Sequence, residues 1–275
     1  MRGTALARFA ANRAAVVAAG VLVTVTAAAV LAPWLAPHDP LAVDLMNTLA
    51  PPSAAHPLGT DHLGRDTLSR LLFGARVSLG IAVTSIGAAL VLGVGLGLLA
   101  AWHRGLVDAA FVRVMDVLLA FPDLLLAIAV VTILGRSQAS TIVAVVVFSL
   151  PTLARVTRAA ALGAVAHDFV LAARAAGASS RWILARHVLP ACLTPIVAQA
   201  TVMLGSAILL ASGLSFLGLG VQPPDPEWGA MLSRGRDMLR AAPLGAVAPG
   251  VAITIVALSF SIAGDGLRDA LDPKG

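Results

Sequence analysis

The sequence has 275 residues, of which 59% are hydrophobic and only 12% are charged, and its mean hydropathy is +0.92. Soluble domains carry about 45–50% apolar and about 25% charged residues, so this composition excludes a soluble globular protein and indicates a chain that lies in lipid. The net charge of +5 comes from arginines dispersed beside apolar runs, which argues against a nucleic-acid partner.

Composition also argues against an enzyme. Cys192 is the only cysteine, so neither an internal disulfide nor a cysteine-built metal site is expected, and the six histidines show no close pairing at ligand spacing. A phosphate-binding loop needs Gly-Lys-Ser/Thr, whereas the only lysine, Lys274, follows Pro273. We therefore expect no catalytic residues, no metal and no cofactor, and any ATP to be bound by other subunits.

Six stretches are apolar enough to form membrane-spanning helices, which need about 20 residues to cross the hydrocarbon core. They predict an all-α polytopic membrane protein with six transmembrane helices. The fourth stretch is short and contains Pro151, so its inner end is expected to be extended or kinked. The stretches are Ala14–Ala36, Val77–Trp102, Val114–Leu134, Thr141–Leu153, Pro195–Val221 and Leu244–Ala263.

The first stretch also resembles a signal peptide, because arginines precede it and Ala27, Ala28 and Ala29 offer small residues for cleavage. Its uncharged run from Ala14 to Pro37 is longer than the usual signal core of about 7–15 residues. We therefore predict an uncleaved anchor helix.

The basic residues predict the orientation. With the N-terminus and C-terminus in the cytoplasm, twelve basic residues lie inside and seven outside, and seven acids balance the outer set. Two polar segments are long, 37–76 outside and about 154–194 inside. The chain is thus expected to divide into an N-terminal anchor with its extracytoplasmic segment (1–76) and a five-helix core (77–275) that carries a large cytoplasmic loop.

The cytoplasmic loop reads as a short Ala-rich helix from Asp168 that ends at Gly177, which can adopt a left-handed conformation. Ser179 or Ser180 is expected to cap a second helix, and Pro190 marks the return to the membrane. Two interpretations remain level on these residues: a docking surface for another protein, or an amphipathic helix lying on the lipid.

The loop resembles the EAA loop of ABC importer permeases, with two alanines, a glycine four residues later and Leu-Pro twelve and thirteen residues after that glycine. Leu171 stands where the family has glutamate. The resemblance implies that the loop is the coupling helix that fits into a groove of the ATPase subunit. The coupling residues so identified are Ala172, Ala173, Arg174, Gly177, Leu189 and Pro190.

Four further segments resemble dipeptide, oligopeptide and nickel permeases: 56–66, 68–79, 214–229 and 264–273. The last two resemble the C-type subunit of that group. This resemblance implies a type I ABC importer (MetI-like) fold in the bacterial inner membrane. It also implies a homologous B-type permease, two ABC ATPase subunits and an extracytoplasmic substrate-binding protein as partners. Peptides are the expected substrate, with nickel or another small solute as the alternative.

Asp116 and Asp123, seven residues apart on the third expected helix, share a face of that helix. An acid inside the membrane indicates a functional position, here the pathway or its inner mouth. The alternative, which we favour, is an ion pair with Arg113, Arg155 or Arg158.

Ser206 and Ser212 are candidates for lining the pathway, because they are small polar residues in the apolar fifth helix. Gly93 and Gly97 predict close helix packing. Three outer residues are candidate contacts of the binding protein, or else belong to an ordinary polar loop with an interfacial aromatic: Asp225, Glu227 and Trp228.

Two rival functions remain. A carrier or channel driven by an ion gradient predicts ionisable residues on several helices and an inverted repeat, of which only the pair of aspartates is present. A membrane scaffold without transport activity would use the cytoplasmic loop for recruitment alone.

Overall fold

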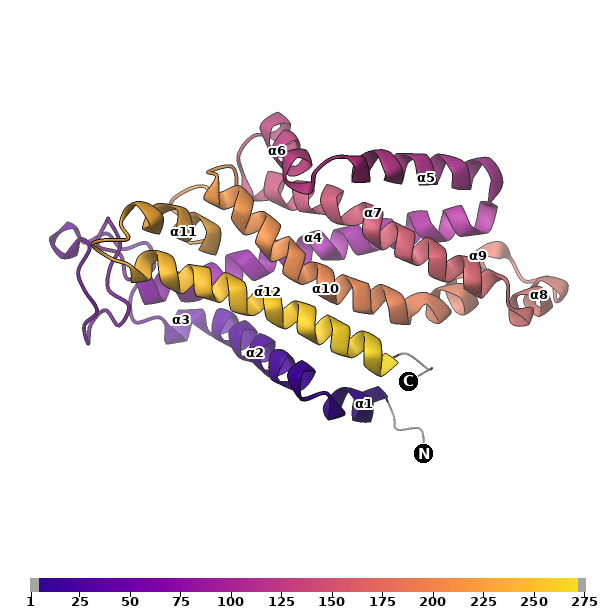
Figure 1. The fold of residues 1–275 in the computed structure, drawn as a ribbon, viewed down its shortest axis with the longest axis horizontal. Coiled ribbons are helices and arrows are strands. Elements are labelled where there is room, and N and C mark those ends of the chain that lie inside the picture. Colours follow the sequence, from indigo (N-terminus) through magenta and orange to yellow (C-terminus); the bar gives the residue numbers. More distant parts are fainter. Residues whose placement is uncertain (1–4, 272–275) are drawn as a thin grey trace.

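The protein is a bundle of long helices in a computed structural model that describes residues 5–271. Figure 1 shows the long helices running along the major axis, with the loops that follow the first span at one end and α8 at the other. Arg2 and Lys274, which entered the prediction of orientation, lie outside the described residues. The helices are α1 (Ala5–Ala11), α2 (Arg13–Val30), α3 (Ala32–Leu35), α4 (Thr67–His103), α5 (Gly105–Ala120), α6 (Asp123–Leu134), α7 (Gln138–Val165), α8 (Asp168–Ala175), α9 (Ser180–Ile183), α10 (Leu189–Phe216), α11 (Trp228–Asp237) and α12 (Leu244–Leu271), with a 3₁₀ turn at Leu45–Asn47 and a π-helical turn at Leu184–Val188.

Five described helical segments are long and apolar enough to span a membrane, and the pair α5 and α6 supplies a sixth if it counts as one broken span. The predicted all-helical class is therefore confirmed. The five segments are α2, α4, α7, α12 and the continuous stretch Ser180–Phe216, which joins α9, the π-helical turn and α10.

The third span is not the single helix that the sequence predicted. It bends by 94° between α5 and α6, with Phe121 and Pro122 both in extended conformation at the break. Proline lacks the amide hydrogen that would continue the helix, and it forces the preceding residue out of the helical region. Asp116 thus lies in α5 and Asp123 begins α6, so the prediction that they share a helix face is wrong.

The fourth span is longer than predicted. Its helix, α7, continues through Pro151 to Val165, so the inner end of the fourth stretch is not extended. Membrane helices tolerate an internal proline because neighbouring groups satisfy the freed carbonyl. The first part of the segment 154–194 is therefore helical, and α8 follows it from Asp168. At the outer face, α4 begins ten residues before the predicted Val77, where the Asp66 carboxylate caps the helix by accepting the Ser69 amide.

Close contact between α4 and α7 forms the centre of the bundle. A Cβ on Gly97 would lie 2.6 Å from the carbonyl oxygen of Ala154, and one on Gly93 would lie 3.1 Å from the amide nitrogen of the same residue. Only glycine permits this approach, so the predicted small-residue packing is confirmed and occurs within the chain.

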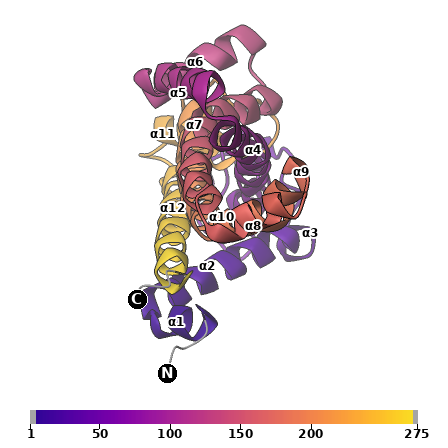
Figure 2. The same ribbon diagram turned by 90° about the vertical axis from the view of Figure 1, so that its right-hand side faces the viewer.

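The N-terminal anchor is part of the same bundle. The α2 helix packs against α12, where a Cβ on Gly266 would lie 2.3 Å from that of Ala15. Figure 2 shows α1 and α2 on the opposite side of the bundle from α5 and α6.

Candidate functional site

Two helix caps define the turn between α8 and α9 in the predicted cytoplasmic loop. At the end of α8 the amide of Gly177 donates to the carbonyl of Arg174, and the amide of Ala178 donates to that of Ala173. This is the Schellman pattern, which needs a left-handed residue, and Gly177 has a φ of +79°. The Ser179 hydroxyl then accepts the Trp182 amide and caps α9. Both predicted caps are confirmed.

Apolar side chains hold the base of this loop on the bundle. Val170 of α8, Ile183 of α9 and Val188 of the π-helical turn are fully buried. They pack in one cluster with Ala101 of α4 and Ala161 of α7. The loop is therefore attached to the ends of three long helices, α4, α7 and α10.

The outer surface of the loop is apolar and open. Leu171, which replaces the glutamate expected from the resemblance, has 57% of its surface exposed, and Trp182 and Phe169 are 50% and 42% exposed. The ring of His187 lies 4.8 Å from that of Trp182 and 6.0 Å from that of Phe169, centroid to centroid. Exposed apolar side chains gathered in this way mark a contact with a partner protein or with the membrane, the two interpretations that the sequence left open.

The predicted coupling residues lie along this surface. Ala172, Arg174 and Gly177 are exposed, and Ala173 is half-buried against the base. A Cβ on Gly177 would meet no atom within 4 Å, so its role within the chain is conformational and the space outside it is free. Leu189 and Pro190 are the first residues of α10 and follow the π-helical turn within the continuous stretch Ser180–Phe216.

Two ion pairs join α5 to α7. The Asp116 carboxylate contacts the Arg155 guanidinium, one of the three partners considered for it, and the Asp108 carboxylate accepts from the Arg158 guanidinium at 2.6 Å. Asp108 was not predicted as a partner, because it precedes the apolar run Val114–Leu134 that contains Asp116 and Asp123. Asp123 is exposed in the first turn of α6 and is not brought to Asp116.

The candidate pathway serines differ in position. Ser206 is half-buried, whereas Ser212 is only 5% exposed. The start of α11 covers Ser212 closely, since a Cβ on Gly229 would lie 2.3 Å from its carbonyl oxygen. In this conformation Ser212 faces another helix and not an open passage.

Two of the three candidate contacts at the outer surface are buried, which corrects their assignment as surface residues. Glu227 and Trp228 are 1% and 2% exposed, and only Asp225 is open to solvent. The Glu227 carboxylate caps α11 by accepting the amides of Gly229 and Ala230. The indole nitrogen of Trp228 donates to the Leu71 carbonyl at 3.0 Å, which joins α11 to α4.

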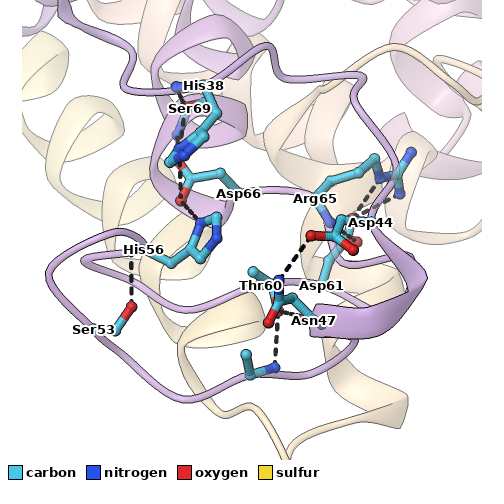
Figure 3. A network of polar contacts seen from close by, with 11 residues as sticks. His38, Asp44, Asn47, Ser53, His56, Thr60, Asp61, Arg65, Asp66 and Ser69 are labelled. Atoms are coloured by element: carbon cyan, nitrogen blue, oxygen red, sulfur yellow. Dashed lines mark hydrogen bonds and ion pairs between the residues drawn. The ribbon is translucent and has the colours of Figure 1, made fainter.

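The extracytoplasmic segment before α4 is a folded structure held by polar contacts (Figure 3). The Arg65 guanidinium pairs with the Asp61 carboxylate at 2.7 Å, and a Cβ on Gly64 would clash with the Asp44 carbonyl. Burial alone would raise the pKa of Asp61, but hydrogen bonds from Arg65 and the loop amides outweigh it, and the pKa lies below its ordinary value. Burial lowers the pKa of neighbouring His62.

The chain is similar to known transport proteins over nearly its whole length. Residues 93–274 match the family described as "binding-protein-dependent transport system inner membrane component", and residues 2–52 match the "N-terminal TM domain of oligopeptide transport permease C". The chain is 45% identical to the di/tripeptide transport system permease protein DppC of Pseudomonas aeruginosa, over 97% of this chain and 90% of that protein. It is 44% identical to the glutathione transport system permease protein GsiD of Pectobacterium atrosepticum, over 97% and 89% respectively.

Among solved structures, the fold is similar to a chain of the inward-facing MetNI methionine ABC transporter, with a TM-score of 0.59 and 20% identity. The likeness covers 74% of this chain and 98% of that chain. The MetI-like fold expected from the sequence is therefore confirmed.

Proposed function

Because the chain belongs to the family of binding-protein-dependent transport system inner membrane components, we propose that it forms half of an import pathway for short peptides. As a member it is a multi-pass permease of the inner membrane, and ATP is hydrolysed by separate ATPase subunits of the transporter. The relatives named for di- and tripeptides and for glutathione support this substrate class, since glutathione is itself a tripeptide.

The mechanism is supported by one observation: α8 and α9 expose apolar side chains on one side and bury Val170 and Ile183 on the other. Leu171 and Trp182 would meet a groove of an ATPase subunit, and the small side chain of Ala172 lets that subunit approach the backbone. Two ATPases would dock, one on this chain and one on a homologous B-type permease that forms the other half of the pathway. A leucine in place of the family's glutamate makes the contact at position 171 apolar.

The attachment of the loop to three long helices supports a mechanism of alternating access, in which the pathway opens to one side of the membrane at a time. Closure of the ATPases would push on 172–177, and the push would pass through the buried Val170 and Ile183 to α4, α7 and α10 together. ATP can drive this change only if it binds one state of the transporter better than the other. Asp116, Asp123 and Ser206 remain candidates for the inner mouth or the pathway, and Asp225 for contact with the binding protein.

The two parts of the chain would differ in role. Residues 1–76 would serve as the anchor helix and extracytoplasmic segment, and residues 77–275 as the permease core. The two matching family descriptions, which cover 2–52 and 93–274, support a division of this kind.

Uptake by proteoliposomes tests the proposal. The chain, co-purified with its partner subunits and supplied with the binding protein, should import labelled di- or tripeptide only when ATP reaches the ATPases, and unlabelled glutathione or tripeptide should compete. ATP-driven uptake that no short peptide reduces would overturn the substrate class. Uptake by the chain alone, driven by a proton or sodium gradient, would overturn the importer in favour of the self-contained carrier.

A further inference from the structure

Two histidines that are far apart in the sequence meet one buried carboxylate at the outer end of the bundle. His38 follows α3, His56 lies in the loop after the 3₁₀ turn, and Asp66 caps α4. Figure 3 shows both imidazole rings turned toward the Asp66 carboxylate. Their pairing could not be predicted from the sequence, because the two histidines are eighteen positions apart and meet only through the folding of the loop between them.

The three side chains offer ligand atoms at metal-binding separations. The Nδ1 atoms of His56 and His38 lie 3.0 Å and 4.0 Å from Asp66 Oδ1, and one ligand atom from each residue lies within 4.8 Å of the other two. Ligands at about 2.0–2.2 Å from a common zinc ion lie roughly 3–3.5 Å from one another. Bringing the widest separation, 4.8 Å, down to about 3.5 Å requires a shift of about 1–1.5 Å. The His38 side chain, which is 40% exposed and stacks on the His56 ring, would make this shift.

The groups behind these ligands hold them in position. Asp66 Oδ2 accepts both the amide and the hydroxyl of Ser69 at 2.7 Å, which leaves Oδ1 directed at the histidines. The Ser69 hydroxyl oxygen also accepts the backbone amide of His38, so one residue fixes two of the three ligands. The backbone of His56 is fixed by hydrogen bonds with Ser53. Such outer contacts orient the ligands in protein metal sites.

We propose that His38, His56 and Asp66 form a binding site for a divalent first-row transition metal of the zinc type. Two imidazole nitrogens and one carboxylate oxygen are the donor set that suits Zn²⁺ and its neighbours, whereas Ca²⁺ and Mg²⁺ prefer oxygen ligands alone. Three protein ligands leave a fourth coordination position, and the exposed edge of His38 opens that position to solvent.

The ion would add a further link between three segments that already contact one another: the exit from the first span, the external loop and the start of α4. The site would therefore stabilise the extracytoplasmic segment, independently of which substrate crosses the membrane.

The test uses the full chain in its transporter complex, purified without a polyhistidine tag and stripped of metal by a chelator. Zn²⁺ is added, free ion is removed by gel filtration, and zinc per chain is measured by elemental analysis; a parallel titration with Co²⁺ follows its visible absorption. The variants are His38→Gln and Asp66→Asn, the second chosen because asparagine caps a helix as well as aspartate does. His62→Gln is the matched control, a histidine of the same loop that lies with Asp61 and Arg65 outside the cluster.

We expect one Zn²⁺ per wild-type and His62→Gln chain, with binding to His38→Gln and Asp66→Asn weakened by roughly tenfold or more. Thermal unfolding should give the same order, with Zn²⁺ raising the Tm of wild type and of His62→Gln only. Binding that is absent in wild type, or equal in all four proteins because other histidines supply it, would overturn the proposal.

Discussion

The guanidinium of Arg174 lies 4.3 Å from the centroid of the Trp102 ring, and this contact joins α8 to the last turns of α4. Because α4 packs against α7, the proposed mechanism predicts that a displacement of α8 reaches the centre of the bundle through this pair as well as through the buried base.

Replacing Arg174 should weaken the coupling of ATP hydrolysis to transport. A cation–π contact at an exposed site contributes about 0.5–1 kcal/mol, which corresponds to a loss of about two- to fivefold. We expect Arg174→Ala to lower the number of peptides imported per ATP hydrolysed by that factor, while the ATPase still co-purifies. Arg236→Ala is the control, since it removes a similar contact with Phe216 at the other end of the bundle. Equal coupling ratios in the two variants would contradict the role of Arg174.

On α4, a methyl group should be tolerated at Gly95, which faces open space, and not at Gly97, which contacts α7. A Cβ at Gly97 would lie 2.6 Å from the Ala154 carbonyl oxygen, whereas one at Gly95 would meet no atom within 4 Å. Gly97→Ala is therefore expected to destabilise the fold by about 1–3 kcal/mol through overpacking. Gly95→Ala should be neutral or slightly stabilising, because alanine favours the helix. Thermal unfolding of the two detergent-solubilised variants measures the difference, and similar Tm values would refute the close packing.

Glu227 and Asp225 lie two residues apart and should have separable effects. Loss of the α11 cap in Glu227→Ala should cost about 0.5–2 kcal/mol and lower the Tm. Asp225→Ala removes only an exposed carboxylate and should leave the Tm unchanged while raising the Kd for the binding protein. Unfolding curves and binding-protein titrations on both variants decide this. A lower Tm in Asp225→Ala, with binding intact, would reverse the assignment.

The Asp61–Arg65 pair predicts a loss of stability in acid. Burial opposes ionisation of Asp61, but the bonds from Arg65 and two amides prevail and lower the pKa of the folded state. A lowered pKa stabilises the fold above the unfolded-state pKa of about 3.9, and this stability is lost as the pH falls through the folded value. The Tm advantage of wild type over Asp61→Asn should be constant from pH 7 to about 5 and should shrink below about pH 4. An advantage that grows in acid would contradict the ionised pair.

Local patterns predicted the coupling loop well. Gly177 and Ser179 act on backbone groups within a few residues, so their roles as caps could be inferred from sequence alone. The long helices could also be predicted, because a run of about 20 apolar residues is a local signal. Their ends were less accurate, because α7 continues through Pro151 on tertiary support that a sequence pattern does not contain.

The break at Pro122 is local, but the spacing of Asp116 and Asp123 placed them on one face only for a straight helix. Features that depend on distant segments were not predicted. The segment before Trp228 has the composition of a surface loop. Trp228 is nevertheless buried against α4, which lies some 150 residues earlier in the chain. His38 and His56 meet only because the external loop folds back on α4.

The proposed function places the docking site of an ATPase at the loop around Gly177. Gly177 and Gly218 both have left-handed backbones, with φ of +79° and +75°, and a Cβ on either would meet nothing within 4 Å. Tryptophan at either position therefore costs the same backbone strain, but only Gly177 lies on the cytoplasmic loop. Co-purification from native membranes measures the partners of wild type, Gly177→Trp and Gly218→Trp. We expect all three proteins to retain a second permease, and Gly177→Trp alone to lose the ATPase. Retention of the ATPase by Gly177→Trp at the level of Gly218→Trp would contradict it.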